Sequence, residues 1–256
     1  MNTQKMKMAA KLGALVAALS LFFSAFSFGA VTYRIKDTKH NLGSTGYSNW
    51  RATDTSEICI FCHTPHNSVA GKKWLWNRTL SGSSPTSFAL YTSSPTISFK
   101  SGPYGVLSEV SKLCMSCHDG VTALNSMANP SPPPSGGGAI NTAFGDSQYC
   151  GEENGCLPWS VNIGNGALWT GVNPGNDLTN DHPVSFSYSA AMNNDNTIND
   201  ISVPKNAGLI FWTAAGGTTG DMVECVTCHD PHIKSNPKFL RRSNGSSNLC
   251  FACHNK

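Results

Sequence analysis

The sequence predicts a mostly irregular, loop-rich fold with short α-helices and a few short strands. Its 256 residues include 24 glycines and 14 prolines, and no long stretch shows the alternation of helices and strands that an α/β enzyme needs. Only 39% of the residues are hydrophobic, which is low for a globular domain. Ten cysteines and eight histidines are unusual counts, so we expect something other than aliphatic side chains to supply much of the core.

The N-terminus has the pattern of a secretory signal peptide. Three lysines precede an apolar run from Leu12 to Phe23, and small residues follow it. The spacing of Ser27 and Gly29 favours cleavage after Gly29, so residues 1–29 are predicted to be removed. An uncleaved anchor helix is the alternative, but the run is short for a membrane span.

The charge balance of the remaining chain argues against a nucleic-acid partner. Without the three lysines of the leader, 15 of the 18 basic residues remain, and they match the 15 acidic ones. A net charge near zero predicts no nucleic-acid partner. We therefore expect an exported chain with no stable membrane span.

Four segments of five residues share the pattern C-x-x-C-H. A random arrangement of these residue types would give about 0.01 such segments, whereas the pattern is the attachment motif of c-type haem. Two thiols bind the porphyrin covalently, and the adjacent histidine is the proximal ligand of the iron. The sequence thus predicts four haem c groups, attached through Cys59 and Cys62, Cys114 and Cys117, Cys225 and Cys228, and Cys250 and Cys253, with His63, His118, His229 and His254 on the irons.

Two other uses of paired cysteines fit this pattern less well. Four C-x-x-C pairs could form two zinc sites, but zinc gives no reason for a histidine after every second cysteine. A disulfide between cysteines this close in sequence makes a strained, redox-active loop rather than a structural cross-link.

The four remaining histidines supply one further imidazole for each predicted iron; they are His40, His66, His182 and His232. We therefore expect all four irons to be six-coordinate with two histidines, although any one of these residues could instead lie at the surface. An iron with both axial positions filled cannot bind oxygen, nitrite or peroxide. The chain is thus expected to transfer electrons and not to be an enzyme.

Two of these histidines closely follow a proximal ligand, in His63-Thr-Pro-His66 and His229-Asp-Pro-His232. Three residues span at most about 10–11 Å and the proline is stiff, so the two rings of one segment are not expected to reach opposite faces of one iron. Each second histidine should instead bind a neighbouring haem. The expected assignments are His66 to the Cys114/Cys117 haem, His232 to the Cys250/Cys253 haem, His182 to the Cys225/Cys228 haem, and His40 to the Cys59/Cys62 haem or an equivalent one.

The motifs divide the exported chain into two dihaem modules, residues 30–128 and 181–256. In each module a spare histidine precedes a tight motif (the C-x-x-C-H-x-P-H segment) and then a closing C-x-x-C-H motif. Short helices are expected over Ser108–Cys114 and Asp221–Cys228, because each segment begins with a residue that caps helix N-termini.

A connecting region, residues 129–180, joins the modules. It is rich in glycine, proline and asparagine, which is typical of a loop or linker. Cys150 and Cys156 lie in it and are expected to form a disulfide in an oxidising compartment. The Glu152, Glu153 and Asn154 side chains between them could bind calcium, but nothing in their spacing requires it.

The string C-H-x-P-H followed by a second C-x-x-C-H, with His182-Pro-Val and with Phe239-Leu-Arg before Leu249-Cys250, resembles the doubled-C-x-x-C-H multihaem cytochromes. With four haems, eight histidines and this length, the chain is similar to the outer-surface tetrahaem cytochromes of metal-respiring bacteria, some of which form filaments known as nanowires. The resemblance implies few helices and strands, alternating stacked and T-shaped haem pairs, and delivery of electrons to extracellular acceptors.

We therefore expect an electron-transfer protein at the cell surface or outside the cell, which polymerises with copies of itself and exchanges electrons with other cytochromes and extracellular acceptors. A monomeric periplasmic shuttle and a multihaem reductase with one open iron are the alternatives. His40 lies on a polar arm near the start of the exported chain, flanked by Gly43 and Gly46. The resemblance implies that it could bind a haem of an adjacent copy; ligation of its own Cys59/Cys62 haem is the other expectation.

Overall fold

Regular structure is scarce and short in this protein, as the sequence predicts. The computed structural model describes residues 34–46, 51–79, 88–91, 107–119, 127–129, 142–143, 177–179, 181–213 and 216–255, all of which belong to one unit, residues 33–256. The predicted signal peptide and the predicted Cys150–Cys156 disulfide loop lie outside the described residues. Within those residues, the helices all fall short of the length and apolar character needed to cross a membrane.

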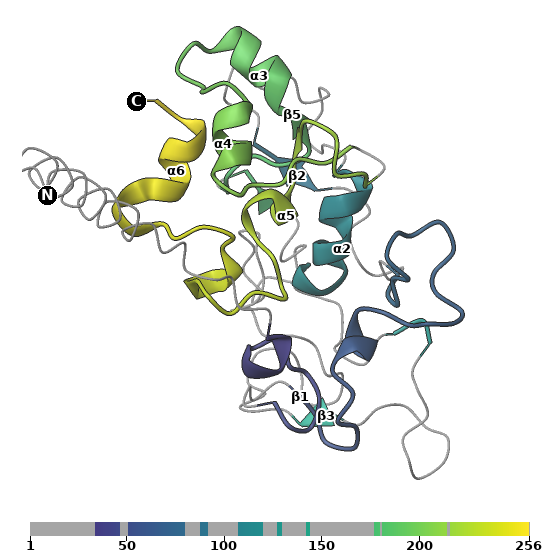
Figure 1. The fold of residues 1–256 in the computed structure, drawn as a ribbon. Helices are drawn as coiled ribbons and strands as arrows, with labels where there is room; N and C mark the ends of the chain where they lie inside the picture. The colour runs from purple at the N-terminus through teal and green to yellow at the C-terminus, as the bar shows by residue number, and fades with distance from the viewer. Residues whose placement is uncertain are drawn as a thin grey trace, which may run out of the picture. The chain divides into compact units, whose positions relative to one another are not determined.

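The described elements fall into three groups. The α-helices are α2 (Glu109–His118), α3 (Tyr188–Asn194), α4 (Ser202–Asn206), α5 (Cys225–Cys228) and α6 (Asn248–Cys253). The 3-10 helices are η2 (Ile35–Asp37), η3 (Cys59–Phe61), η6 (Pro237–Phe239) and η7 (Gly245–Ser247). The strands are β1 (Arg51–Ala52), β2 (Ala89–Leu90), β3 (Thr142–Ala143), β4 (Asp177–Leu178), β5 (Phe186–Ser187) and β6 (Met222–Val223) (Figure 1).

The strands form three two-stranded sheets. The pairs β1–β3 and β5–β6 are antiparallel, and β2–β4 is parallel. Each strand has two residues, so these ladders contribute few hydrogen bonds and serve to join segments that are distant in sequence. The β5–β6 pair, for example, joins the chain after His182 to the chain before Cys225, with Phe186 opposite Val223.

The helix α2 begins where the sequence predicts. The Ser108 hydroxyl accepts a hydrogen bond from the Ser111 N–H, which satisfies one of the free donors at the helix start. Val110, Leu113 and Met115 are buried on the inner face. The helix continues to His118, so it carries the whole second attachment motif.

The helix α5 begins later than expected, at Cys225 rather than at Asp221. Residues Met222–Val223 are extended because they pair with β5, so the helix cannot form until the strand ends. Glu224 then caps it: its backbone N–H donates to the Thr227 hydroxyl at 2.9 Å, and its carbonyl accepts the Thr227 N–H at 2.9 Å. The Asp221 carboxylate instead accepts the Ser187 hydroxyl at 2.6 Å.

Among the described residues, the buried apolar side chains form three small clusters. They consist of Ala52, Ile60 and Phe61; of Phe88, Leu90, Leu107, Met115 and Leu178; and of Tyr188, Leu209, Phe211, Val223 and Ala252. Motif cysteines pack against two of them, Cys62 and Cys117 against the first and Cys253 against the third. The buried side chains therefore gather around the predicted attachment points.

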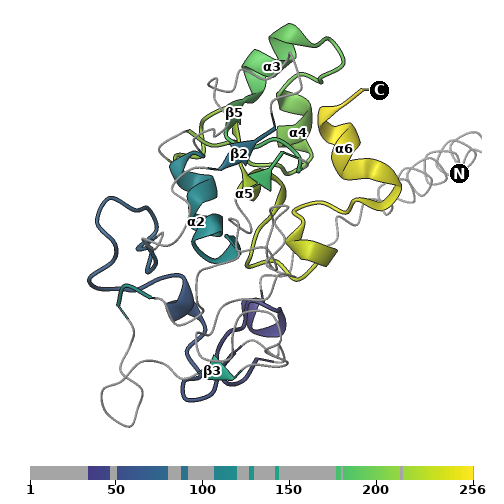
Figure 2. The same cartoon turned by 180° about the vertical axis from the view of Figure 1, so that it is seen from behind.

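One helix contact brings two attachment motifs together, and a second holds the helix of the fourth motif. Figures 1 and 2 show α2 beside α5 and α6 beside α4, and both pairs are in contact. At the first contact, the Cys225 N–H donates to the Ser111 hydroxyl at 3.2 Å, and that hydroxyl donates to the buried Glu224 carboxylate. The second and third attachment motifs, one from each predicted module, are thus joined by a buried polar network.

Candidate haem-binding sites

Three pairs of imidazole rings face each other at nearly the same separation. The ring centres lie 6.1 Å apart for His40 and His118, 6.3 Å for His63 and His232, and 6.4 Å for His182 and His254. A bond of about 2 Å from a metal to each imidazole nitrogen, with half a ring on either side, places two ring centres about 6 Å apart. The residues present therefore fit an iron between the rings of each pair.

Each of these pairs joins one proximal histidine of a C-x-x-C-H motif to one spare histidine, as bis-histidine ligation requires. The ring planes differ: they are 19° apart for His63 and His232, but 69° for His40 and His118 and 68° for His182 and His254. One pair is thus nearly parallel and two are closer to perpendicular.

Two of the observed ring pairs differ from the assignments expected from the sequence. His232 faces His63 rather than His254, and His182 faces His254 rather than His229. The argument from chain reach does hold in one respect, since His232 faces a ring outside its own motif. Chain length rules out the haem of the same motif as the partner of a spare histidine. Which of the other haems it approaches depends on long-range packing.

The His40 ring likewise lies beside a ring other than the one expected for the Cys59/Cys62 haem, while its binding to an adjacent copy stays a prediction. Its ring faces His118 of the same chain and stacks on Phe239 at 4.3 Å. The arm is anchored rather than mobile, because Thr38 and Asn41 are buried and the Asn41 amide donates to a backbone carbonyl five residues before it at 2.8 Å. These contacts hold His40 inside the unit.

Burial keeps His40 in the form that binds metals. Desolvation, helped by the charges of His118 and His232, lowers the pKa of His40 to about 4. The Pro231 carbonyl opposes the shift without reaching hydrogen-bond geometry. The ring is therefore neutral at physiological pH, as an iron ligand must be.

The hydrogen bonds of other candidate ligands fix which ring nitrogen is free. A carbonyl oxygen can only accept, so an imidazole Nδ1 in contact with one carries the proton and leaves Nε2 for a metal. Such contacts join His63 Nδ1 to the Trp74 carbonyl (2.6 Å), His229 Nδ1 to the Lys238 carbonyl (2.8 Å) and His182 Nδ1 to the Pro183 carbonyl (2.9 Å).

The turn behind the first motif has an unusual backbone. Trp74 and Leu75 have φ values of 57° and 55°, a left-handed conformation that bulky residues rarely adopt. This turn directs the Trp74 carbonyl at His63 and lets the Asn77 N–H donate to the Cys62 carbonyl at 2.8 Å.

The third motif is built in the same way. Lys238 and Phe239 have φ values of 56° and 60°, the Lys238 carbonyl meets His229, and the Arg241 N–H donates to the Cys228 carbonyl at 2.8 Å. The two tight motifs are therefore copies of one structural unit. The sequence analysis missed this unit, because left-handed turns without glycine have no sequence signature and the distance from histidine to carbonyl differs, eleven residues in one copy and nine in the other.

The two remaining histidines of the tight motifs are not paired. Among the residues that the structure describes, no imidazole faces His229, and His66 is exposed. The backbone of His66 is nevertheless held, since its carbonyl accepts the Thr64 hydroxyl at 2.7 Å and the Asn129 amide at 2.9 Å.

The attachment thiols lie close to one another across motifs. A hydrogen bond between the thiols of Cys114 and Cys225 raises the pKa of Cys114 and lowers that of Cys225. Burial raises the pKa of Cys62 and of Cys228 to about 12 and that of Cys253 to about 11. The attachment points of the second and third motifs are therefore adjacent, and burial holds most of these thiols in the protonated form.

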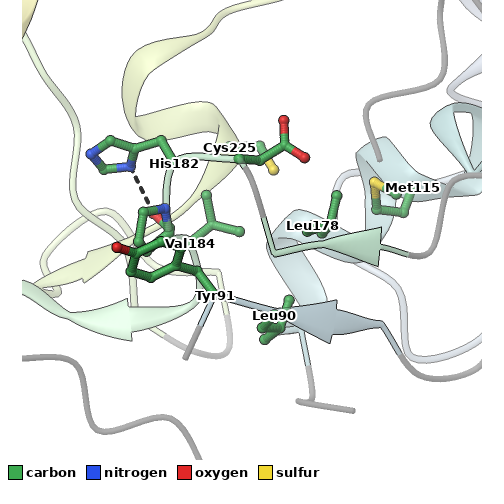
Figure 3. A pocket seen from close by; sticks show the side chains of 9 residues that line it. Leu90, Tyr91, Met115, Leu178, His182, Val184 and Cys225 are labelled. Carbon is green, nitrogen blue, oxygen red and sulfur yellow. Dashed lines mark hydrogen bonds between the residues drawn. The ribbon is translucent and has the colours of Figure 1, made fainter. Parts of the chain in front are cut away.

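A mostly apolar cavity lies between the parallel strands and the third motif (Figure 3). Its lining brings Cys225, the first thiol of the third motif, together with His182, which faces the histidine of the fourth motif. The other lining residues are Leu90, Tyr91, Met115, Leu178, Asp181, Pro183 and Val184.

The comparison with known proteins concerns the C-terminal part of the chain. Residues 218–256, which contain the third and fourth motifs, match the family model of the doubled CXXCH motif. No curated protein shows a significant match to the chain. The family match supports a multihaem c-type cytochrome that takes part in electron transfer through covalently bound haem c.

Proposed function

We propose that this protein conducts electrons through four haem c groups, each iron held between two histidines. The observation that carries the proposal is the set of three imidazole pairs separated by 6.1–6.4 Å, each joining a proximal to a spare histidine. Iron held in this way has no open axial position, so it exchanges electrons without binding a substrate. The alternative, a reductase with an open iron, requires that the iron bound by His229 of the third motif lacks a second histidine.

His66 completes the fourth iron in this proposal, opposite His229. The two tight motifs are copies of one unit, and the spare histidine of the second copy, His232, faces the proximal histidine of the first, His63. The reciprocal exchange would bring His66 to His229. The anchored backbone of His66 leaves its side chain exposed and available for such a bond.

If each tight motif supplies a ligand to the iron of the other, the haems of the first and third motifs (the two central haems) would be held close together. Each central iron would take one histidine from each module, so metal binding would tie the modules to one another. The adjacent thiols of Cys114 and Cys225 bring a further pair of attachment points together. Short separations of this kind are what electron hopping requires.

We further propose that the chain is exported and acts at the cell surface, passing electrons between copies of itself, other cytochromes and extracellular acceptors. This proposal rests on the signal-like N-terminus and on the resemblance to outer-surface tetrahaem cytochromes. Within one chain the His40 ring centre lies 6.1 Å from that of His118, so in this proposal the contact between copies does not depend on His40. A monomeric periplasmic shuttle is the alternative.

Two experiments test these proposals. The mass of the purified holoprotein should correspond to four covalent haems, and its ferric spectra should show low-spin iron alone, with slow binding of carbon monoxide after reduction. Stoichiometric binding of carbon monoxide by one haem would support the reductase instead. Negative-stain microscopy of the secreted protein separates the filament, which shows fibres, from the shuttle, which shows none.

A further inference from the structure

His232 differs from the other candidate ligands in the partner of its Nδ1. Its Nδ1 lies 2.9 Å from Oδ1 of Asp230, and the same oxygen accepts the His232 backbone N–H at 3.0 Å. Asp230 is only 7% exposed. A buried carboxylate therefore stands where His63, His182 and His229 each meet a neutral carbonyl.

Arg241 holds this carboxylate from the other side. Its Nη1 donates to Oδ2 of Asp230 at 3.0 Å, and its Nε donates to the Val226 carbonyl at 2.8 Å. The largely buried guanidinium is the counter-charge of the carboxylate, and together with the His232 ring on Oδ1 it fixes the orientation of the carboxylate toward that ring.

The other tight motif lacks this arrangement. Thr64 occupies the position of Asp230, between the proximal histidine and the proline. Its hydroxyl donates to the His66 carbonyl at 2.7 Å and accepts the Asn129 amide at 3.0 Å. Two motifs with similar turns therefore differ in whether a negative charge lies beside the spare histidine.

We propose that Asp230 is a positioning residue that lowers the reduction potential of the iron held between His63 and His232. The inference rests on the proposed ligation of that iron. An anionic acceptor on Nδ1 fixes the ring orientation and makes Nε2 more basic, which favours ferric over ferrous iron. Thr64 carries no charge and does not lower the potential of the iron that His66 would bind. The haems of the first and third motifs therefore differ in potential, and electrons pass more readily from the haem of the first motif to that of the third.

A redox titration of the holoprotein, followed by visible and electron paramagnetic resonance (EPR) spectroscopy, tests this inference. Asp230→Asn keeps the shape of the side chain and removes its charge. At a fixed potential it should raise the ratio of reduced to oxidised iron at one haem at least tenfold, a shift of about 59 mV for one electron, and leave the other haems unchanged. Asp230→Glu should restore most of the wild-type potential.

Two further variants separate an electrostatic role from a merely structural one. Arg241→Gln removes the balancing cation and should shift the same haem in the opposite direction, to lower potential. Thr64→Asp adds a carboxylate in the other tight motif, with the Asn129 amide already placed to bind it, and should lower the potential of a different haem.

The outcomes distinguish this inference from the proposed function. Unchanged potentials in Asp230→Asn, with low-spin haems throughout, would overturn the inference and leave the proposed function intact. Shifts of Asp230→Asn and Arg241→Gln in the same direction would also overturn it, because loosening the site would then explain both. Failure of the proposed function would instead be visible in the wild-type protein, as fewer than four haems or as high-spin iron.

Discussion

The imidazole rings of His63 and His232 face each other at 6.3 Å with their planes 19° apart, although they belong to tight motifs in different halves of the chain. An iron between them would be attached in the first module and ligated from the second. Because metal binding of this kind contributes directly to folding free energy, loss of either ring should affect both modules.

The ring orientations predict the EPR spectrum of the ferric protein. Parallel imidazoles donate into the same iron d orbital and separate it in energy from its partner, whereas perpendicular rings leave the two nearly degenerate. We therefore expect an ordinary rhombic low-spin signal from the iron between His63 and His232. The two irons whose ring planes are 69° and 68° apart should give strongly anisotropic signals with a large maximum g value. Rhombic signals alone would contradict these orientations.

Replacing the spare histidines of the tight motifs should create open irons at specific haems. His232→Ala should make the Cys59/Cys62 haem high-spin, and His66→Ala should do the same at the Cys225/Cys228 haem. His182→Ala is the matched control, and it should affect the Cys250/Cys253 haem. Haem-specific nuclear magnetic resonance signals of the paramagnetic protein identify the altered iron. A high-spin Cys250/Cys253 haem in His232→Ala would contradict the observed pairing.

His40 should act within one chain and make stability depend on pH. The pKa of His40 is about 4 in the folded protein against an ordinary value of 6.5, so the unfolded state binds more protons between these values. Stability is therefore full above pH 6.5 and falls as the pH drops toward 4, by about 3 kcal/mol at most. Urea unfolding at several pH values measures this change.

The variant His40→Ala is the control for that prediction. It should lose this part of the pH dependence and should acquire one high-spin haem at every protein concentration, since the expected bond lies within the chain. A high-spin haem that appears in the wild-type protein only on dilution would show instead that His40 binds another copy.

Asn77 should be important for the stability of the first tight motif. Its fully buried amide donates to the Ile60 carbonyl at 2.7 Å and to the Asn129 carbonyl at 3.0 Å, and its oxygen accepts the Asn129 N–H at 2.8 Å. Asn77→Ala leaves these partners unsatisfied and should cost about 2–4 kcal/mol in denaturant unfolding. Asn194→Ala, which removes one exposed hydrogen bond in α3, should change stability by at most about 0.5 kcal/mol. Equal effects of the two variants would contradict this role.

Local features of the fold could be predicted from the sequence where neighbouring residues decide them. The N-cap at Ser108 and the helix that follows were predicted correctly, because a serine hydroxyl satisfies free backbone donors within one turn. The start of α5 was predicted wrongly at Asp221, because pairing with β5, a long-range contact, keeps the residues before Glu224 extended.

The sequence by itself determined the chemistry of this protein, since the attachment thiols and proximal histidines lie within five residues of one another and need no long-range folding to be adjacent. It also set the number of spare imidazoles and excluded the pairing of His232 with His229. Only the tertiary structure decided that His40 faces His118, that His182 faces His254 and that His232 faces His63 beside the Asp230 carboxylate. Ring pairs of this kind form between segments far apart in the chain, and their separation depends on helix contacts and left-handed turns that no local pattern encodes.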